Sequence, residues 1–313
     1  MNQASGAVPG TAHFFQPRIL LPFALVTLIW GSTWLVIRDQ VGSVPPGWSV
    51  TWRFCLAGVA MMVLAAANRQ SLRITRDGLP LILTMGLFQF SANFQFVYAA
   101  EVNLTSGIVA VLFAALMVPN AVFARIFLGQ PVSRGFVAGS IVALGGIALL
   151  LLHEYHVAPP EGRVLLGVLL TVGGIIGASI ANVAQAGTRA ARQPMLALLA
   201  WSMLFGAGVN AILSALIYGP PQFEPRWGYA GGIAYLALMG SVVTFPLYFR
   251  LVRELGPGRA AYNGVLVPII AMLLSTVFEG YRWSVLAVAG AVVAIAGLVL
   301  ALRARGTRAA TSD

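Results

Sequence analysis

The sequence predicts an all-α polytopic membrane protein, with ten transmembrane helices arranged as two inverted five-helix repeats around a central cavity. Three observations predict this fold: an apolar composition, evenly spaced apolar runs and a weak internal repetition. Of the 313 residues, 59% are hydrophobic and only 9% are charged, whereas soluble domains carry about 25% charged residues. A chain with a mean hydropathy of +0.86 is typical of a bilayer protein and does not suit a water-soluble core.

The apolar runs are about 20 residues long, which is the length that crosses the hydrocarbon core as a helix. All 19 basic residues are arginines. If the N-terminus is cytoplasmic, fourteen of them fall on inner segments and four on outer loops, and Arg53 is left inside a span. This asymmetry follows the positive-inside rule, so we expect both termini to be cytoplasmic. The predicted spans are 19–37, 47–67, 79–100, 104–126, 134–152, 164–187, 194–218, 229–250, 259–279 and 283–302.

The two halves of the chain resemble each other. "YAAEVNLTSGIVAVLFAALMVP" (98–119) and "YFRLVRELGPGRAAYNGVLVP" (248–268) share a Tyr, a Glu, a short connection, small residues and a proline inside the next span. Each half has an odd number of spans, so the second copy is inverted, as in secondary transporters that bind solute between their repeats. We expect a cytoplasmic tail (1–18), a first repeat (19–152), a periplasmic linker (153–163), a second repeat (164–303) and a cytoplasmic tail (304–313).

The corner before the ninth span predicts a hinge. Gly256 and Gly258 lie in a tight turn, and Pro268 interrupts the helical hydrogen bonds of the ninth span, as Pro119 does in the fourth. Membrane helices tolerate prolines where neighbouring groups satisfy the freed backbone. We expect the two prolines to flex as a pair, and a static packing kink is the alternative.

The signature of Tyr, Glu, short turn, small residues and Pro, followed by "LGQP" (128–131) and a glycine-rich fifth span, resembles the EamA-type drug/metabolite transporters. The resemblance covers residues 19–303, and within that superfamily the chain is similar to bacterial exporters of aromatic and other amino acids. It implies ten helices around a cavity lined mainly by spans 1, 3, 4, 6, 8 and 9, with alternating access.

Polar and aromatic residues inside the spans are the candidate substrate-binding residues, because polar groups within a membrane tend to face protein or water. Gln89 and Asn93 are four residues apart and share a helical face with Phe96. Amides can instead bond a neighbouring helix, and tryptophans can belong to interfacial belts. The full set is Trp30, Ser32 and Trp34 in the first span, Gln89, Asn93 and Phe96 in the third, Asn182 and Gln185 in the sixth, Thr244 and Tyr248 in the eighth, and Asn263 in the ninth.

Arg53 is the one cation well inside a predicted span. It lies about six residues from the start of the helix, so we expect it to snorkel to the outer surface or to make a structural bond. Capture of a substrate carboxylate is the alternative.

The driving force for transport is inferred by elimination. The chain has no G-x-x-x-x-G-K-[ST] motif and no lysine with which to build one, so it has no phosphate-binding ATPase site of that kind. Glu101, Glu254 and Glu279 fall at span ends, and no acid lies at mid-span, where proton coupling usually needs one. We therefore expect a facilitator. His153, Glu154 and His156 are read as a solvated loop, and the sequence calls for no metal or cofactor.

We expect a secondary transporter that exports amino acids, aromatic and other neutral ones favoured, and related amphipathic metabolites across the bacterial inner membrane. The choice of amino acids depends on the resemblance and on the aromatic residues of the expected cavity. The alternatives are an exporter of another metabolite or drug with the same fold, and a membrane enzyme acting on a lipid-linked substrate. The expected partners of the transporter are its small-molecule substrate and the lipid bilayer. Nucleic acid is not expected as a partner, since the arginines are scattered singly along the chain. The chain is expected to be a monomer or a homodimer.

Overall fold

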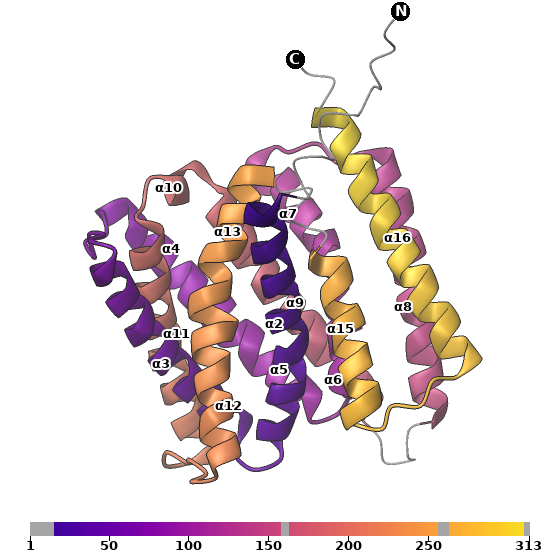
Figure 1. The fold of residues 1–313 in the computed structure, drawn as a ribbon, viewed down its shortest axis with the longest axis horizontal. Helices are drawn as coiled ribbons and strands as arrows, with labels where there is room; N and C mark the ends of the chain where they lie inside the picture. The colour runs from indigo at the N-terminus through magenta and orange to yellow at the C-terminus, as the bar shows by residue number, and fades with distance from the viewer. Residues whose placement is uncertain (1–15, 158–162, 256–262, 310–313) are drawn as a thin grey trace, which may run out of the picture.

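A computed structural model describes residues 16–157, 163–255 and 263–309 of the chain. All the regular elements of these residues are helices (Figure 1). The long helices of a single type are α2 (Pro17–Val41), α3 (Pro46–Ala67), α8 (Arg134–Val157), α9 (Val164–Ala186), α11 (Met195–Tyr218), α15 (Asn263–Phe278) and α16 (Val285–Ala309).

Three further rods change helix type along their length. The first consists of α4 (Leu79–Thr84), η2 (Met85–Asn93) and α5 (Phe94–Glu101). The second consists of α6 (Ser106–Phe113), η3 (Ala114–Leu116) and α7 (Met117–Leu128), and the third of α12 (Trp227–Ala237), η4 (Leu238–Val243) and α13 (Thr244–Leu255). Short helices η1 (Arg76–Gly78) and α10 (Thr188–Ala191) lie in the connections. Each predicted span thus coincides with one rod of the described chain.

The predicted boundaries differ from the observed ones at several helix ends. The fifth span continues as helix to Val157, so His153, Glu154 and His156 belong to α8 and not to a loop. The last helix continues to Ala309, beyond the predicted limit of the second repeat. Hydropathy marks only the apolar part of a helix, so it does not detect helical turns that project beyond the bilayer. Gly256 and Gly258 lie outside the described residues.

The pair α8 and α16 forms one edge of the molecule (Figure 1). Glycines on both helices bring their backbones together. A Cβ added at Gly146 would lie 2.2 Å from the amide nitrogen of Ala294, and one at Gly297 would lie 2.2 Å from that of Ala143. The small residues of the fifth and tenth spans therefore join the two helices within one chain, as close helix approach in membranes requires.

The segments η2 and η4 are π-helices, and they occupy the equivalent third and eighth spans of the two halves. A π-helix leaves backbone groups out of the regular α pattern, and such turns occur frequently at functional sites. Side chains of other helices satisfy the carbonyls: Asn210 Nδ2 donates to Phe90 O at 2.8 Å, and Trp30 Nε1 donates to Gly240 O at 3.3 Å. Each π segment is therefore fixed by a helix that packs against it.

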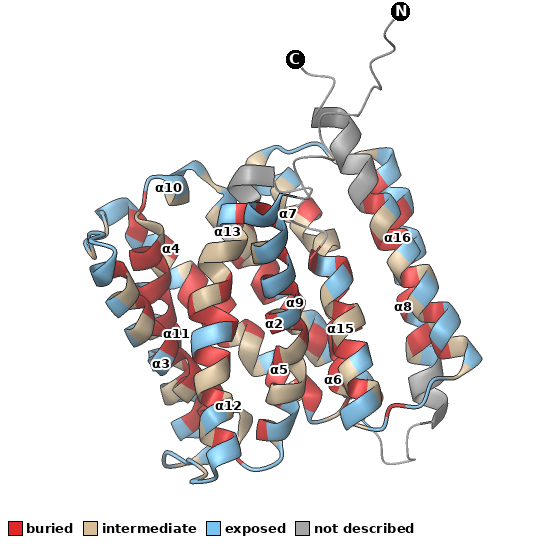
Figure 2. Ribbon diagram, viewed as in Figure 1, coloured by how far each residue is buried: buried red, intermediate tan, exposed pale blue. Residues whose placement is uncertain are grey.

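The burial pattern is that of a membrane protein (Figure 2). Large apolar side chains face outward, among them Leu216 at 79% exposure and Val285 at 89%, while Ser241, Thr244 and Asn210 are fully buried. Contiguous apolar surface on this scale is rare on soluble monomers. Within the described chain, seven helices or rods are long and apolar enough to cross a membrane, and α15 and α16 add shorter apolar helices. The protein is a multi-pass membrane protein.

Candidate functional site

A cavity of about 290 Å³ lies among helices of both halves. Its walls come from α2, α3, η2, α5, α6, η3 and α7 of the first half and from α9, η4, α13, α15 and α16 of the second. Among the lining residues are Trp30, Trp34, Gln89, Asn93, Asn182, Tyr248, Asn263 and Pro268, which the sequence predicts for the site or its hinge. The cavity therefore draws on spans 1, 3, 4, 6, 8 and 9, with additions from spans 2 and 10.

An aromatic wall surrounds Trp30 in α2. The indole Nε1 donates a hydrogen bond to Thr244 Oγ1 at 2.9 Å and a longer one to the carbonyl of Gly240. Its ring lies 5.1 Å from that of Tyr248 and 5.8 Å from that of Phe245, distances at which aromatic pairs attract each other. These contacts join α2 to η4 and α13, so the wall links the two halves of the molecule.

Amide side chains supply the polar part of the lining. Gln89 and Asn93 are buried in η2, and Asn93 Oδ1 has no hydrogen-bond partner among the described residues. Asn263 Oδ1 accepts a hydrogen bond from Thr27, while its Nδ2 has no partner in the described chain. Buried amides are normally satisfied. A solute in the cavity could pair with both groups.

Five predicted residues lie outside the cavity lining. Ser32 bonds the hydroxyl of Tyr235 at 2.7 Å, and Thr244 is buried behind Trp30. Gln185 lies in the last turn of α9 and Pro119 near the start of α7. Phe96 is 39% exposed.

The position of Phe96 has a specific cause. The prediction placed it on one face with Gln89 and Asn93 by counting α-helical turns, but the chain is π-helical from Met85 to Asn93. A π turn takes up more residues than an α turn, so every residue after the segment is rotated relative to that count. The cavity receives Phe94 and Val97 instead.

The two prolines occupy different environments. Pro268 lies inside α15 and lines the cavity together with Gly264, four residues earlier. Since proline has no N–H, it cannot bond the Gly264 carbonyl in the α-helical pattern. Pro119 is the third residue of α7, directly after the 3₁₀ turn Ala114–Leu116. The first turn of a helix has no intrahelical partner for its N–H groups, so a proline is tolerated there.

Arg53 does not snorkel to the surface. Its residue is 2% exposed, and it lines the cavity. The guanidinium carbon lies 4.4 Å from the centre of the Phe94 ring and 5.2 Å from that of Phe54, within the range of cation–π attraction. The expectation that Arg53 snorkels is wrong because this face of α3 packs against α5 and η4, where the guanidinium lies beside Phe94 and Gly240.

Beyond Ile37 and Val97 of the cavity wall, the ends of α2 and α5 are tied together. Tyr98 donates a hydrogen bond to Gln40 Oε1 at 3.3 Å, and Arg38 donates to the carbonyl of Glu101. Tyr98, Gln40 and Glu101 are completely buried. These contacts pack α2 and α5 together at the ends of the two helices.

Sequence reasoning missed several lining residues. Phe113 and Phe245 lie in apolar runs without a polar neighbour that would single them out. The ring of Phe113 lies 5.5 Å from that of Trp34 in a tilted arrangement. Asn120 had a usable signal, since it is an amide inside the fourth span beside Pro119. Its Oδ1 accepts a hydrogen bond from Asn182 Nδ2 at 3.5 Å.

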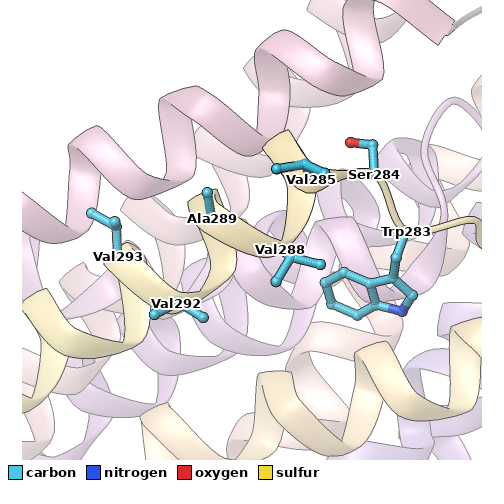
Figure 3. A pocket seen from close by; sticks show the side chains of 7 residues that line it. All are labelled: Trp283, Ser284, Val285, Val288, Ala289, Val292 and Val293. Carbon is cyan, nitrogen blue, oxygen red and sulfur yellow. The ribbon is translucent and has the colours of Figure 1, made fainter.

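A larger hollow of about 620 Å³ lies along α16 (Figure 3). It is lined by one helix and the residues before it: Trp283, Ser284, Val285, Val288, Ala289, Val292 and Val293. Val292 is 60% exposed. An apolar surface with walls from one side only fits lipid chains, whereas solute sites enclose most of the ligand. The cavity between the halves is therefore the candidate site.

An all-helical, membrane-spanning fold with a cavity between two similar halves defines the class of helical membrane carriers. The EamA-like transporter family model matches residues 18–152 and again 165–303, once in each half. The chain belongs to the EamA-like transporter family.

Relatives agree with this membership, and a solved structure shares the fold. The chain is 29% identical over 272 residues, 84% of its length and 85% of the other, to the uncharacterized inner membrane transporter YedA of Escherichia coli (strain K12). It is 23% identical to protein PagO of Salmonella typhimurium (92% and 93% covered). It is 22% identical to a probable amino-acid metabolite efflux pump of E. coli K12 (88% and 92%). A solved structure entitled only as the crystal structure of a protein matches with a TM-score of 0.66, 20% identity and coverage of 92% and 97%.

Proposed function

We propose that this transporter exports amino acids, aromatic and other neutral ones favoured, and related amphipathic metabolites across the inner membrane by alternating access. The observation that carries the proposal is the cavity of about 290 Å³ between the halves, with indole and phenyl rings beside buried amides. Such a lining suits a small solute that has an apolar body and a few polar groups. The amino-acid metabolite efflux pump among the relatives supports the same solute class.

The proposed driving force is the solute gradient alone, without proton coupling. Among the described residues that line the cavity, none carries a carboxylate. Glu101 ends α5, and Glu279 follows α15, where its Oε2 accepts hydrogen bonds from Ser275 Oγ and from the amide of Ser106. Transport in vesicles that is abolished by a proton ionophore would overturn this part of the proposal.

In this proposal α15 bends during alternating access. Pro268 leaves the backbone of Gly264 without its helical bond at the cavity wall. The repeat-related Pro119 contributes through the 3₁₀ turn that precedes α7. In the proposed topology the C-terminal ends of α2, α5 and α15 lie on the periplasmic side, and both termini of the chain lie in the cytoplasm.

Solute counterflow in reconstituted vesicles tests the proposed function. Vesicles loaded with unlabelled phenylalanine should accumulate labelled phenylalanine transiently when they contain the wild-type protein. Asn93→Ala and Tyr248→Ala remove a lining amide and a lining phenol, and each should weaken apparent affinity about 5- to 30-fold, the cost of about 1–2 kcal/mol of lost contacts. Leu216→Ala changes a residue exposed to lipid and should leave counterflow unchanged.

The same assay decides between the substrate alternatives. A panel of amino acids, a quaternary amine and a sugar should rank neutral amino acids first. Exchange of the amine or the sugar without exchange of any amino acid would favour the same-fold exporter of a drug or another metabolite. Absence of counterflow for every solute, in protein that is folded by circular dichroism, would count against a transport function for these solutes.

A further inference from the structure

We infer that Arg53 is the anion-binding group of the cavity, which takes the carboxylate of the transported solute. The inference rests on the proposed function for the identity of the solute and extends it by assigning the charge that the solute must carry. The observations concern burial, hydrogen bonding and position. Each is a property of the described residues around α3.

The first observation is that the Arg53 guanidinium is buried without a full set of partners. The residue is 2% exposed, and its Nε and Nη1 atoms have no hydrogen-bond partner in the described chain. Transfer of a charged group into an apolar interior is costly unless the charge is paired and hydrogen-bonded. An arginine with unused N–H groups can bind a carboxylate through charge-assisted hydrogen bonds.

The second observation is that the neighbouring carboxylate does not use these atoms. Glu101 is near enough to interact electrostatically with Arg53, as well as with Arg38 and Glu279. However, both of its carboxylate oxygens also lack hydrogen-bond partners in the described structure. By contrast, Arg226 forms ion pairs with Asp39 and Glu224. Tyr98 is the nearby phenol, and its interaction with Arg53 leaves Nε and Nη1 unused.

The third observation is that the guanidinium is held at the cavity wall. The rings of Phe94 and Phe54 lie on it at 4.4 and 5.2 Å, and Phe94 lines the cavity with it. Space in front of it is kept by Gly240 of η4, where an added Cβ would lie 3.6 Å from Arg53 Nη2 and 3.0 Å from Thr33. A stacked, pre-oriented arginine loses little side-chain freedom when a planar anion arrives.

These observations assign the polar ends of a bound solute. The carboxylate pairs with Arg53, and the apolar body lies against Trp30, Trp34 and Phe113 of the same cavity. The unpartnered Asn93 Oδ1 can accept from the ammonium of a zwitterion. Binding therefore requires a carboxylate on the solute, and an ammonium group on the solute adds a further interaction.

The experiment compares three ligands that differ only in their charged groups: phenylalanine, 3-phenylpropionate (no ammonium) and phenethylamine (no carboxylate). Binding to the purified full-length protein is measured by ligand-induced thermal stabilisation, and transport by counterflow in vesicles. With the wild type we expect phenethylamine to bind about 10- to 100-fold more weakly than phenylalanine, the effect of one lost charge-assisted interaction. We expect 3-phenylpropionate to stay within about 10-fold of phenylalanine.

Substitution of the arginine separates a binding role from a structural one. Arg53→Gln should weaken phenylalanine and 3-phenylpropionate about 10- to 100-fold and leave phenethylamine unchanged within about 3-fold. Arg53→Lys keeps the charge but loses the planar guanidinium and its several N–H donors, so its affinities should lie in between. Arg189→Gln, at an exposed arginine of α10, is the matched control and should leave all three ligands unchanged.

Two results would overturn the inference. One is wild-type protein that binds phenethylamine as tightly as phenylalanine, which needs no variant and so stands even if Arg53 variants fail to fold. The other is an Arg53→Gln protein in which all three ligands weaken together, as a structural role of Arg53 in holding α3 would produce. If 3-phenylpropionate binds and exchanges while no amino acid does, the proposed function fails and the assignment of Arg53 stands.

Discussion

Trp30 shows how single side chains connect the two halves of the transporter. Its ring lines the cavity, and its Nε1 donates to Thr244 and to the Gly240 carbonyl of a π-helical segment. The sequence identified the tryptophan because it lies beside polar residues within a span. It could not identify the partners, because hydrogen bonds between residues more than 200 positions apart leave no mark on local spacing.

Trp30→Phe keeps an aromatic ring and removes the N–H. We expect the free energy of unfolding in detergent to fall by about 1–3 kcal/mol, since a buried hydroxyl and a buried carbonyl lose their donor. The matched control is Trp201→Phe, because Trp201 is 41% exposed and donates to the carbonyl of Leu72 at 3.0 Å. Thermal melting of the two variants measures the effect. Equal losses in both would contradict the role given to Trp30.

Glu224 gives a pH-dependent prediction in the connection between α11 and α12. Hydrogen bonds from Ser43 and from Arg226 lower the pKa of the Glu224 carboxyl. A carboxyl whose pKa is lower in the folded protein stabilises the fold above its unfolded pKa of about 4.3, and this contribution is lost as the pH falls through the folded value. Glu224→Gln should therefore melt at a lower temperature than wild type at pH 7.

The difference between Glu224→Gln and wild type should shrink steadily as melting is repeated from pH 6 towards pH 3. Because Ser43 and Arg226 are solvent-exposed, the difference in melting temperature should be small and should weaken in high salt. Arg226→Gln removes one of the two donors and should reduce the pH dependence. A constant difference across the whole range would mean that the carboxyl charge is not involved.

The sequence did not reveal that parts of two spans are π-helical rather than α-helical. Apolar runs located the rods to within a few residues, because burial in a bilayer demands length and hydrophobicity whatever the helix type. The π segments Met85–Asn93 and Leu238–Val243 satisfy the same demand, so hydropathy cannot distinguish them from α-helix. The assignment of Phe96 to the cavity face was the direct result of that omission.

Close packing of α8 on α16 predicts a sharp difference between two adjacent glycines. A Cβ at Gly146 would lie 2.2 Å from the backbone nitrogen of Ala294, while one at Gly145 would meet nothing within 4 Å. Gly146→Ala must therefore separate the helices, and we expect a loss of stability of about 1–3 kcal/mol. Gly145→Ala should be neutral or slightly stabilising, because alanine favours helix more than glycine does.

Thermal melting and protease resistance of the two variants measure this difference. Gly290→Ala, at the facing position of α16, should behave like Gly146→Ala, since its added Cβ would lie 2.7 Å from the backbone of Leu150. A Gly146→Ala protein as stable as wild type would mean that the helices are not in backbone contact.

At the scale of the whole molecule, the arrangement of the spans followed from charge and repetition, whereas the contacts between the ends of α2 and α5 did not. Arginine asymmetry and the inverted repeat need only the order of residues along the chain. The contacts among Tyr98, Gln40 and Glu101 depend on how α2 and α5 meet, and no pattern within either helix encodes that meeting. For the same reason the sequence left Arg53 between snorkelling to the surface and making a structural bond, although it placed Arg53 within a span.

The proposed orientation can be tested by cysteine labelling. The chain has a single cysteine, the half-buried Cys55, so Cys55→Ser provides a background without thiols. In that background Gln222→Cys, in an exposed connection, should react with a membrane-impermeant maleimide in intact cells after the outer membrane is opened. Arg189→Cys should react only after the inner membrane is permeabilised. Reaction of both sites from the same side would contradict a membrane crossing by α11, and the reverse accessibility of the two sites would contradict the proposed orientation.

The paired π-helical segments affect where the gene can lose a residue. Because a π turn holds one residue more than the α turn it replaces, deletion of a single codon within 85–93 or 238–243 would let that stretch relax to ordinary α-helix. The residues downstream in the rod, among them Phe94 and Val97 or Phe245 and Tyr248, would then keep their faces towards the cavity. In a regular α-helix the same deletion turns every following residue by about 100° about the axis, so one-residue deletions should be better tolerated in these two stretches than in spans without a π turn.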